Sequence, residues 1–301
     1  MKDNKNKTNY KVGYIALIGK PNVGKSTLMN VLLGQKLSIV TPKPQTTRHR
    51  ILGILSEENT QMIFLDTPGL LKPRYKLQDK MLGAARRAID ESDVLLLMVE
   101  PEEKIDEVII NILSTMKGSQ KSVILVINKI DTVNKKKLLP IIDRYASKFN
   151  LTKIFPISAL KQEGLDELKS CLKDNLPKGF PFYPEDMITE HPERFFVSEI
   201  IREKIFQNYG DEIPYSTTVL IEEFKEREGR KDFIRANIIV EKDSQKGILI
   251  GKKGAALKKV GSSARDQIEQ FLDREVYLEL FVKVREKWRK KDVFLKEFGY
   301  G

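Results

Sequence analysis

The segment from Gly19 to Ser26, Gly-Lys-Pro-Asn-Val-Gly-Lys-Ser, constrains the fold more than any other part of this 301-residue sequence. It matches the pattern G-x-x-x-x-G-K-[ST], in which backbone N–H groups and a lysine surround phosphate oxygens. The pattern functions between a strand and a helix, and an apolar run (Val12–Ile18) precedes it while a helix-compatible stretch (Ser26–Leu33) follows it. We therefore predict an α/β domain with a phosphate loop.

The side chains of this loop have distinct predicted roles. Lys25 is expected to reach the β- and γ-phosphates, and the Ser26 hydroxyl is expected to ligate Mg²⁺. Lys25 is accordingly predicted to be catalytic as well as nucleotide-binding. The predicted phosphate-binding set is Gly19, Pro21, Asn22, Val23, Gly24, Lys25, Ser26 and Thr27.

The next motif follows a second apolar run. The run Met62–Leu65 leads into Asp66-Thr67-Pro68-Gly69. An acid at the end of a strand beside a phosphate loop suits the metal, and the Gly69 backbone can approach the γ-phosphate and detect its loss. This motif alone is weak, but in this order it predicts a switch segment.

Two later segments predict that the base is guanine. Ser122–Ile127 is a β-branched strand pattern that leads into Asn128-Lys129-Ile130-Asp131. The Asp131 carboxylate can accept hydrogen bonds from the ring N–H and the exocyclic amine of guanine, which adenine does not offer in that arrangement. Ile154–Ile157 is another short strand, and Ser158 and Ala159 follow it where a backbone N–H can meet the guanine O6.

In this order the motifs resemble the translation-factor-like class of small GTPases over residues 11–175. The resemblance implies a mostly parallel sheet with helices on both faces and the nucleotide at the carboxyl ends of the strands. It also identifies Thr41–Arg48 as a first switch segment, in which a threonine completes the Mg²⁺ shell. Thr47 is favoured over Thr46 because related families place this ligand directly before the arginine, whereas spacing alone does not decide between them.

Leu70 stands where many signalling GTPases carry a glutamine that orients the attacking water. A leucine cannot orient water, so the chain resembles the hydrophobic-substituted subgroup and slow intrinsic turnover is expected. Positive charge for catalysis can come from a monovalent cation, an external arginine, or Lys72, Arg74 and Lys76. Asn22 has two open interpretations: a potassium ligand, as in potassium-dependent relatives, or a residue whose hydrogen bond stiffens the loop.

The net charge of +11 is unevenly distributed. Residues 1–180 carry 30 Lys and Arg against 19 Asp and Glu, whereas residues 181–301 carry 23 of each. Any polyanion site in the second half therefore depends on a local cluster. Residues 242–265 form such a cluster, with seven basic residues and one acid.

The second half begins after a proline-rich stretch, 177–193, which is predicted to be a linker. Its expected elements are an amphipathic helix around 196–205, strands at 215–221 and 234–240, a Gly-x-x-Gly turn between helices, and a strand at 276–284. This order and this turn are typical of a type II KH module, whose loop clamps about four single-stranded nucleotides. The predicted RNA-binding residues are Lys246, Ile248, Ile250, Gly251, Lys252, Lys253, Gly254 and Lys258. Trp288 and Phe294 are expected to pack in the interior, and the basic stretch 283–291 is open to either RNA contact or plain solvation.

A GTPase of this subgroup followed by a KH module resembles the bacterial Era GTPases across essentially the whole chain. The segments that carry the resemblance are Gln45–Arg48, Asp66–Leu70 and Ser244–Gly254. The resemblance implies a switch that binds GTP and GDP with Mg²⁺, binds the 3′ end of small-subunit rRNA, and assists assembly of the 30S-type subunit. It also implies a cytoplasmic protein with peripheral contact to the inner face of the membrane, and we expect a monomer.

The expected domain boundaries are a flexible tail (1–10), a GTPase domain (11–176), the linker (177–193) and a KH domain with a basic C-terminal tail (194–301). The single cysteine excludes an intrachain disulfide and fits a reducing compartment, and no apolar run is long enough for a membrane span. Two alternatives remain: a tRNA-modification or tandem-GTPase relative, which would lack the KH region, and a nucleotide-gated RNA-binding protein with negligible turnover.

Overall fold

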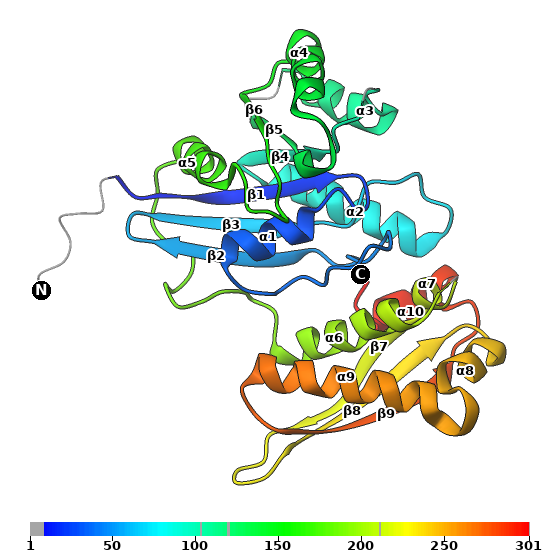
Figure 1. Cartoon of the computed structure of the whole chain (residues 1–301). Helices are drawn as coiled ribbons and strands as arrows, with labels where there is room; N and C mark the ends of the chain where they lie inside the picture. Colours follow the sequence, from blue (N-terminus) through cyan, green and yellow to red (C-terminus); the bar gives the residue numbers. More distant parts are fainter. Residues whose placement is uncertain (1–8, 103, 119–120, 211, 301) are drawn as a thin grey trace, which may run out of the picture. The chain divides into compact units, whose positions relative to one another are not determined.

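The computed structural model describes residues 9–102, 104–118, 121–210 and 212–300. Most of the predicted tail therefore lies outside the described residues. The chain divides into two compact units, which are considered separately (Figure 1). Unit 1 contains residues up to 38, 47–72 and 81–190, and unit 2 contains 39–46, 73–80 and 191–301.

The core of unit 1 is a six-stranded sheet with the order β2-β3-β1-β4-β5-β6. β2 pairs antiparallel with β3, and the other neighbouring pairs are parallel. The strands are β1 (Lys11–Gly19), β2 (Ile51–Glu57), β3 (Thr60–Asp66), β4 (Val94–Val99), β5 (Ser122–Ile127) and β6 (Lys153–Pro156). Every residue of β3 and β4 is buried, as expected for parallel strands covered on both faces. The mostly parallel α/β fold predicted from the sequence is confirmed.

Except between β2 and β3, helices separate these strands in sequence, and they cover both faces of the sheet (Figure 1). They are α1 (Lys25–Leu33), α2 (Lys76–Glu91), α3 (Glu107–Thr115), α4 (Leu138–Lys148) and α5 (Leu165–Asn175), with short 3₁₀ turns η2 (Ile130–Thr132) and η3 (Lys135–Lys137). α3 begins after Asp106, whose side chain accepts a hydrogen bond from the Val108 N–H. Because β1, β3, β4, β5 and β6 are parallel, the loops that follow them meet at one edge of the sheet.

The proline-rich stretch expected to be a linker is fixed along unit 1 for most of its length. The buried amide of Gln61 donates to the Tyr183 carbonyl (2.9 Å) and accepts from the N–H groups of Phe182 and Tyr183. Farther on, the Ile54 N–H donates to the Ile188 carbonyl (2.7 Å). Residues up to 190 thus belong to unit 1, and only His191 and Pro192 stand between them and helix α6 (Glu193–Asn208).

Unit 2 is built on a three-stranded sheet with the order β7-β8-β9. Its elements are α6 (Glu193–Asn208), α7 (Ile213–Ser216), β7 (Thr218–Lys225), β8 (Asp232–Val240), α8 (Asp243–Ile250), η4 (Lys252–Gly254), α9 (Ala255–Leu272), β9 (Val276–Val284), η5 (Trp288–Lys290) and α10 (Asp292–Glu297). β7 and β8 are antiparallel, while β8 and β9 are parallel. This is the helix and strand order predicted for a type II KH module, and that prediction is confirmed.

One predicted strand in unit 2 is displaced. The sequence pattern placed it at 215–221, but 213–216 form the short helix α7 and β7 starts at Thr218. Pro214 occupies the start of α7, where a missing N–H costs nothing, and the hydroxyls of Ser216 and Thr217 bond back to the Ile213 carbonyl. These local bonds favour a helical turn over an extended chain.

The C-terminal segment of unit 2 is anchored by Trp288, which is fully buried as predicted. Its indole N–H donates to the Ser216 carbonyl (2.8 Å), and its ring stacks with that of Tyr300 and meets that of Phe298 edge-on. Among the residues that the structure describes, no helix is both long and apolar enough to cross a membrane.

Candidate functional site

The phosphate loop lies between the end of β1 and the start of α1, as the motif predicted. Gly24 begins the helix with φ 100°, and a Cβ at this position would lie 2.2 Å from the Asn128 Nδ2. A side chain is therefore excluded both by the backbone conformation and by its neighbour. This packing joins the loop to the motif that follows β5.

Lys25 is buried in the loop, with 5% of its surface exposed. Its Nζ donates to the carbonyls of Gly19 (3.1 Å) and Lys20 (2.9 Å), so the ammonium lies inside the curve of the loop. Burial lowers the pKa of Lys25 to about 8, and the nearby Asp66 carboxylate opposes this shift. A phosphate anion in the loop would favour the charged form.

Asp66, at the end of β3, gathers three hydroxyl groups. Its Oδ2 accepts from Ser26 Oγ (2.7 Å), Ser38 Oγ (2.9 Å) and Thr47 Oγ1 (3.5 Å). Burial raises the pKa of Asp66, and Lys25 and these hydroxyls oppose the shift. Its Oδ1 is buried without a hydrogen-bond partner among the described residues. An unpartnered carboxylate oxygen beside two hydroxyls fits Mg²⁺, which binds oxygen ligands and retains several waters.

The two candidate threonines of the first switch segment face different neighbours. Thr47 Oγ1 lies 2.9 Å from Ser26 Oγ. Thr46 Oγ1 instead lies 2.9 Å from Thr41 Oγ1 and donates to the Lys43 carbonyl (2.8 Å). Thr47 thus lies with the predicted metal ligands, and Thr46 is turned away from them.

The Asp66–Leu70 motif approaches the phosphate loop through its backbone. A Cβ at Gly69 would lie 2.5 Å from the Pro21 nitrogen, and the Leu70 N–H donates to the Gly19 carbonyl (2.9 Å). The Leu70 side chain is only 5% exposed and belongs to the core of unit 1. It therefore packs in the interior and leaves no polar group at this position to hold water.

The predicted guanine-reading residues come together at the ends of β5 and β6. Asn128 is buried and bridges two loops, because its Nδ2 donates to the Val23 carbonyl (2.7 Å) and its Oδ1 accepts from the Ala159 N–H (2.9 Å). The exposed Asp131 accepts from Ser158 Oγ at 2.6 Å, which orients the carboxylate. Lys129 has a φ of 65° and forms an ion pair with Glu100.

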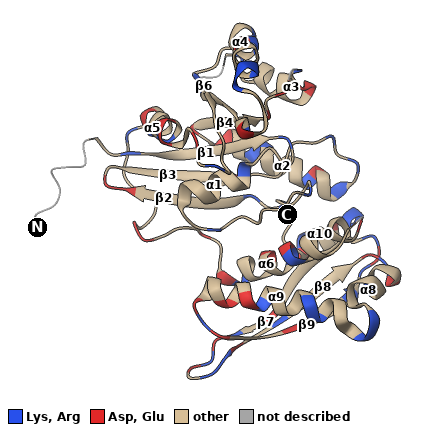
Figure 2. Cartoon of the chain, in the orientation of Figure 1, with Lys and Arg blue, Asp and Glu red and all other residues tan. Residues whose placement is uncertain are grey.

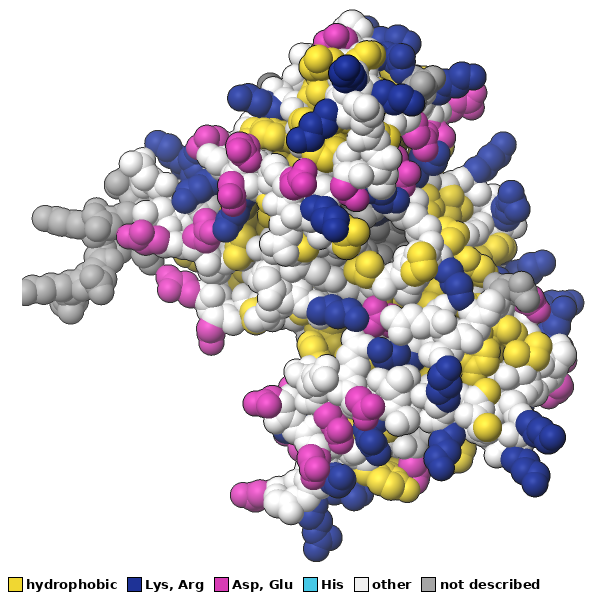
Figure 3. Space-filling view, viewed as in Figure 1, with side chains coloured by type: hydrophobic (Ala, Val, Ile, Leu, Met, Phe, Trp, Pro, Cys, Tyr) yellow, Lys and Arg dark blue, Asp and Glu magenta, His cyan; other side chains and the backbone are white. Residues whose placement is uncertain are grey.

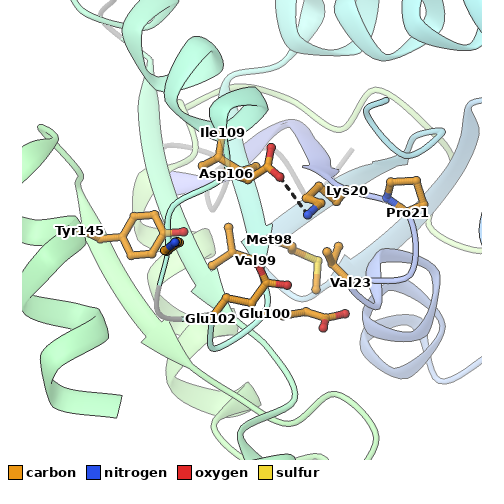
Figure 4. A pocket seen from close by; sticks show the side chains of 11 residues that line it. Lys20, Pro21, Val23, Met98, Val99, Glu100, Glu102, Asp106, Ile109 and Tyr145 are labelled. Carbon is orange, nitrogen blue, oxygen red and sulfur yellow. Dashed lines mark ion pairs between the residues drawn. The ribbon is translucent and has the colours of Figure 1, made fainter. Parts of the chain in front are cut away.

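A cavity of about 240 Å³ lies beside the phosphate loop, between the end of β4 and helices α3 and α4 (Figure 4). It shares Lys20, Pro21 and Val23 with the loop but contains neither Lys25 nor Asp131. Lys20 and Asp106 form an ion pair of 2.9 Å on its wall. The cavity is therefore a neighbour of the predicted nucleotide site and does not include its main charged groups.

The predicted RNA-binding loop in unit 2 joins α8 to α9. Lys252, Lys253 and Lys258 are exposed there, and Figure 2 shows basic residues gathered at this end of α8 and α9. Ile248 is 53% exposed. Ile250 is partly buried against the core of unit 2, so only Ile248 presents most of its side chain to a ligand. Lys246 is half-buried on α8.

Comparison with known proteins assigns both units. Residues 14–129 match the family described as "50S ribosome-binding GTPase", and residues 212–289 match the family described as "KH domain". GTPase Era of Ruminiclostridium cellulolyticum is 45% identical over 291 residues, covering 97% of this chain and 98% of that protein. The chain belongs to the Era family of GTPases.

Other Era proteins support the assignment. The chloroplastic GTPase ERA-like protein of Oryza sativa is 46% identical over 297 residues, which are 97% of this chain and 70% of that protein. A variant of Era from Aquifex aeolicus bound to GDP and AlF₄⁻ superimposes with a TM-score of 0.93 at 45% identity. A structure of Era with MgGDPNP and nucleotides 1506–1542 of 16S ribosomal RNA gives the same TM-score and identity. Both alignments cover 97% of this chain and 99% of the other.

Sequence reasoning missed one residue of this Era-family site. Ser38 is fully buried, and its hydroxyl donates to Asp66 Oδ2, as the hydroxyls of Ser26 and Thr47 also do. Asn30 holds the Ser38 backbone from α1, accepting from its N–H (2.9 Å) and donating to its carbonyl (2.7 Å). No motif in the irregular segment around Ser38 signals this role, which depends on the fold.

Proposed function

We propose that this Era-family GTPase is a nucleotide switch that binds single-stranded RNA at the 3′ end of small-subunit rRNA and assists assembly of the 30S-type subunit. The observation that carries the proposal is the exposed basic Gly251–Gly254 loop in a KH unit joined to a GTPase site. The Era structure that contains nucleotides 1506–1542 of 16S ribosomal RNA supports this choice of RNA.

A binding experiment tests the choice of RNA. The affinity for an RNA copied from nucleotides 1506–1542 would be compared with that for an RNA of the same composition in permuted order. We expect at least about a tenfold preference for the native order, because base-edge contacts discriminate between bases while phosphate contacts do not. Equal affinities would exclude sequence-specific recognition of this rRNA segment.

In the proposed hydrolysis, water attacks the γ-phosphorus of GTP while the bond from that phosphorus to the β–γ bridging oxygen breaks. Lys25 stabilises the charge that spreads over the phosphoryl oxygens, and the Gly69 backbone approaches the γ-phosphate. Ser26 and Thr47 would ligate Mg²⁺, with Asp66 bound through water, and the metal would neutralise part of the developing charge. Lys25, Thr46, Thr47 and Gly69 are the residues predicted from the sequence to be catalytic, and of these Thr46 would act only by positioning Thr47.

The rate of this reaction is proposed to be low, as in the hydrophobic-substituted class. The support is Leu70, whose side chain is committed to the core. Asn22 lies at the exposed edge of the loop with φ 65°, where a K⁺ ion could be bound next to the phosphates. Single-turnover hydrolysis should then be faster in K⁺ than in Na⁺, and equal rates would remove the potassium proposal for Asn22.

A second candidate function is nucleotide-gated RNA binding with negligible turnover, which the burial of Leu70 favours. Turnover measured with and without RNA separates the two, since a switch that hydrolyses GTP should release phosphate faster when its RNA is bound.

We also propose a cytoplasmic monomer with peripheral contact to the inner membrane face. Light scattering and sedimentation with anionic vesicles test these two properties.

A further inference from the structure

The first switch segment is divided between the two units at a single peptide bond. Residues 39–46 group with unit 2, and from Thr47 the chain belongs to unit 1. Thr47 bonds to Ser26 and Asp66 in the predicted metal site. Any group of unit 2 that fixes the carbonyl of Thr46 therefore also restricts the next residue, Thr47, through that peptide bond.

Within unit 2, helix α6 forms hydrogen bonds with segment 39–46 at several points. Arg202 Nη2 donates to the Thr46 carbonyl at 2.5 Å. The Glu203 carboxylate accepts from the Val40 N–H at 3.1 Å. Lys43 donates to the carbonyl of Phe206 at the end of the same helix. The contacts at Val40 and Thr46 use the backbone of the segment and so do not depend on the identity of those two side chains, while the third uses the Lys43 side chain.

Arg202 is held in one orientation. Its Nε and Nη2 donate to the two oxygens of Glu199 at 2.8 and 2.5 Å, and only 1% of its side chain is exposed. Its guanidinium also lies 5.5 Å from the centre of the Phe206 ring. A buried ion pair costs desolvation free energy that its own attraction often fails to recover, so stability alone is a poor reason for this pair. Its distinctive contact is the hydrogen bond to the Thr46 carbonyl.

The same helix contacts the helix that starts at the RNA loop. Glu203 uses one carboxylate oxygen for Val40 and the other to accept from Gln267 Nε2 on α9 (3.2 Å). α9 begins at Ala255, directly after Gly254. The rings of Phe196 on α6 and Phe271 on α9 pack at 5.3 Å. Displacement of α6 would therefore act on α9 through packed and hydrogen-bonded groups.

We propose that Arg202, oriented by Glu199, is a positioning residue that couples the nucleotide state to RNA binding. Its hydrogen bond to the Thr46 carbonyl links the position of Thr47, a predicted Mg²⁺ ligand, to helix α6. Loss of the γ-phosphate releases Thr47, and the change reaches α9 through α6. This inference rests on the proposed function, in which the bound nucleotide controls the binding of RNA.

The test uses the full-length double variant Glu199→Gln/Arg202→Met, which removes both charges and so leaves neither ion buried without its partner. RNA affinity is measured with GDP and with a non-hydrolysable GTP analogue. In the wild type the ratio of the two affinities is expected to be about 5- to 150-fold, the usual range of coupling between two sites. In the double variant it should fall to within about twofold of one, while GDP affinity stays unchanged.

The matched control is Arg235→Met/Glu279→Gln, which removes another Arg–Glu pair of unit 2 (3.0 Å) from the strands β8 and β9. The control should keep the wild-type ratio. Thermal unfolding checks that each variant is folded. If the double variant unfolds, Arg202→Lys replaces it, because a lysine keeps the charge near Glu199 but cannot bond to both partners in the same fork. This variant should lower the ratio by at least about threefold.

The outcomes are separable. A folded double variant or Arg202→Lys variant with the wild-type ratio overturns the role of Arg202. A control that loses the ratio as fully as the double variant also overturns it, because the effect would then be general. A wild type with equal RNA affinity in both nucleotide states overturns nucleotide gating and this inference together. A wild type that binds no RNA overturns the proposed function itself.

Discussion

The molecule contains two glycine loops at helix starts, and they differ most in the burial of their lysines. In the phosphate loop, Lys25 is buried and bonded to loop carbonyls. In the Gly251–Gly254 loop, Lys252 and Lys253 are exposed. Both loops present backbone and positive charge to phosphate groups. The difference is that one is shaped around a single ligand, while the other is open to a polymer.

The comparison indicates how affinity is obtained in each loop. A buried charge interacts strongly with its ligand and is weakly screened by salt, whereas exposed charges are screened within about 10 Å at 0.1 M ionic strength. Nucleotide affinity should therefore depend on a few residues and little on salt. RNA affinity should be spread over several residues and fall steeply as salt rises.

The largest expected effect is that of Lys25→Ala. It removes charged hydrogen bonds to phosphate, each of which contributes about 1.5–3 kcal/mol, so affinity for GDP should fall by about 100-fold or more. Titration of a fluorescent GDP analogue measures the loss. Lys148→Ala, at an exposed position of α4, is the control. If affinity for GDP fell by less than about tenfold, nucleotide binding would not depend mainly on the buried Lys25.

The second largest effect is expected for Asp131, the residue predicted to recognise guanine. In Asp131→Ala the two hydrogen bonds to guanine are lost, and we expect affinity for GTP to fall by about 10- to 100-fold. Competition with ITP, which lacks the exocyclic amine, gives the sharper test. The wild type should prefer GTP over ITP, and the variant should bind both equally. A variant that still prefers GTP would assign base recognition to another residue.

A smaller effect is expected for Lys252→Ala/Lys253→Ala. RNA affinity should fall by about tenfold at 0.1 M salt, and the slope of log affinity against log salt should decrease by about 0.7 for each lysine that contacts phosphate. Nucleotide affinity should not change. The control, Arg230→Ala/Lys231→Ala, removes equal charge from the turn between β7 and β8. An equal loss of RNA affinity in the control would mean that RNA responds to exposed positive charge in general and not to these two lysines.

Single methyl groups in the RNA loop should change the stability of the fold. A Cβ at Gly251, where φ is 69° and ψ −179°, would lie 2.6 Å from the Ala256 Cβ, whereas a Cβ at Gly254 would meet no described atom within 4 Å beyond its own neighbours in the chain. Gly251→Ala should reduce the free energy of unfolding by about 1–3 kcal/mol and Gly254→Ala by about 1 kcal/mol. Chemical denaturation compares them, and a larger loss for Gly254→Ala would contradict the steric argument.

Local motifs made much of this architecture predictable. Ser122–Ile127 and 276–284 were predicted as strands with the bounds that the structure shows, because buried or alternating β patterns there are uninterrupted. The helix α7 was missed because its helical turn depends on hydroxyl groups that donate to the Ile213 carbonyl and on the hydrogen bond from the Trp288 indole N–H to the Ser216 carbonyl. Such bonds are invisible to periodicity.

In the candidate sites too, residues that belong to sequence motifs were predicted, and residues that depend on tertiary contacts were not. Residues that belong to motifs, such as Asp66 and Asn128, lie where the order of motifs placed them. Ser38 and Arg202 were not predicted, because one lies in a segment without pattern and the other reads as part of an amphipathic helix. Their partners are distant in sequence: Asp66 for Ser38, and Thr46 for Arg202. Tertiary contacts of this kind require a structure.

Unit 2 cannot be isolated as one continuous stretch of the chain. Unit 2 includes residues 39–46 and 73–80, so the chain passes from one unit to the other at several peptide bonds. A fragment of residues 191–301 would lack both segments and would expose the Arg202–Glu199 ion pair to water. RNA affinity measured on a recombinant or proteolytic KH fragment would consequently be that of a unit whose helix α6 has lost the segment that covers it in the intact chain.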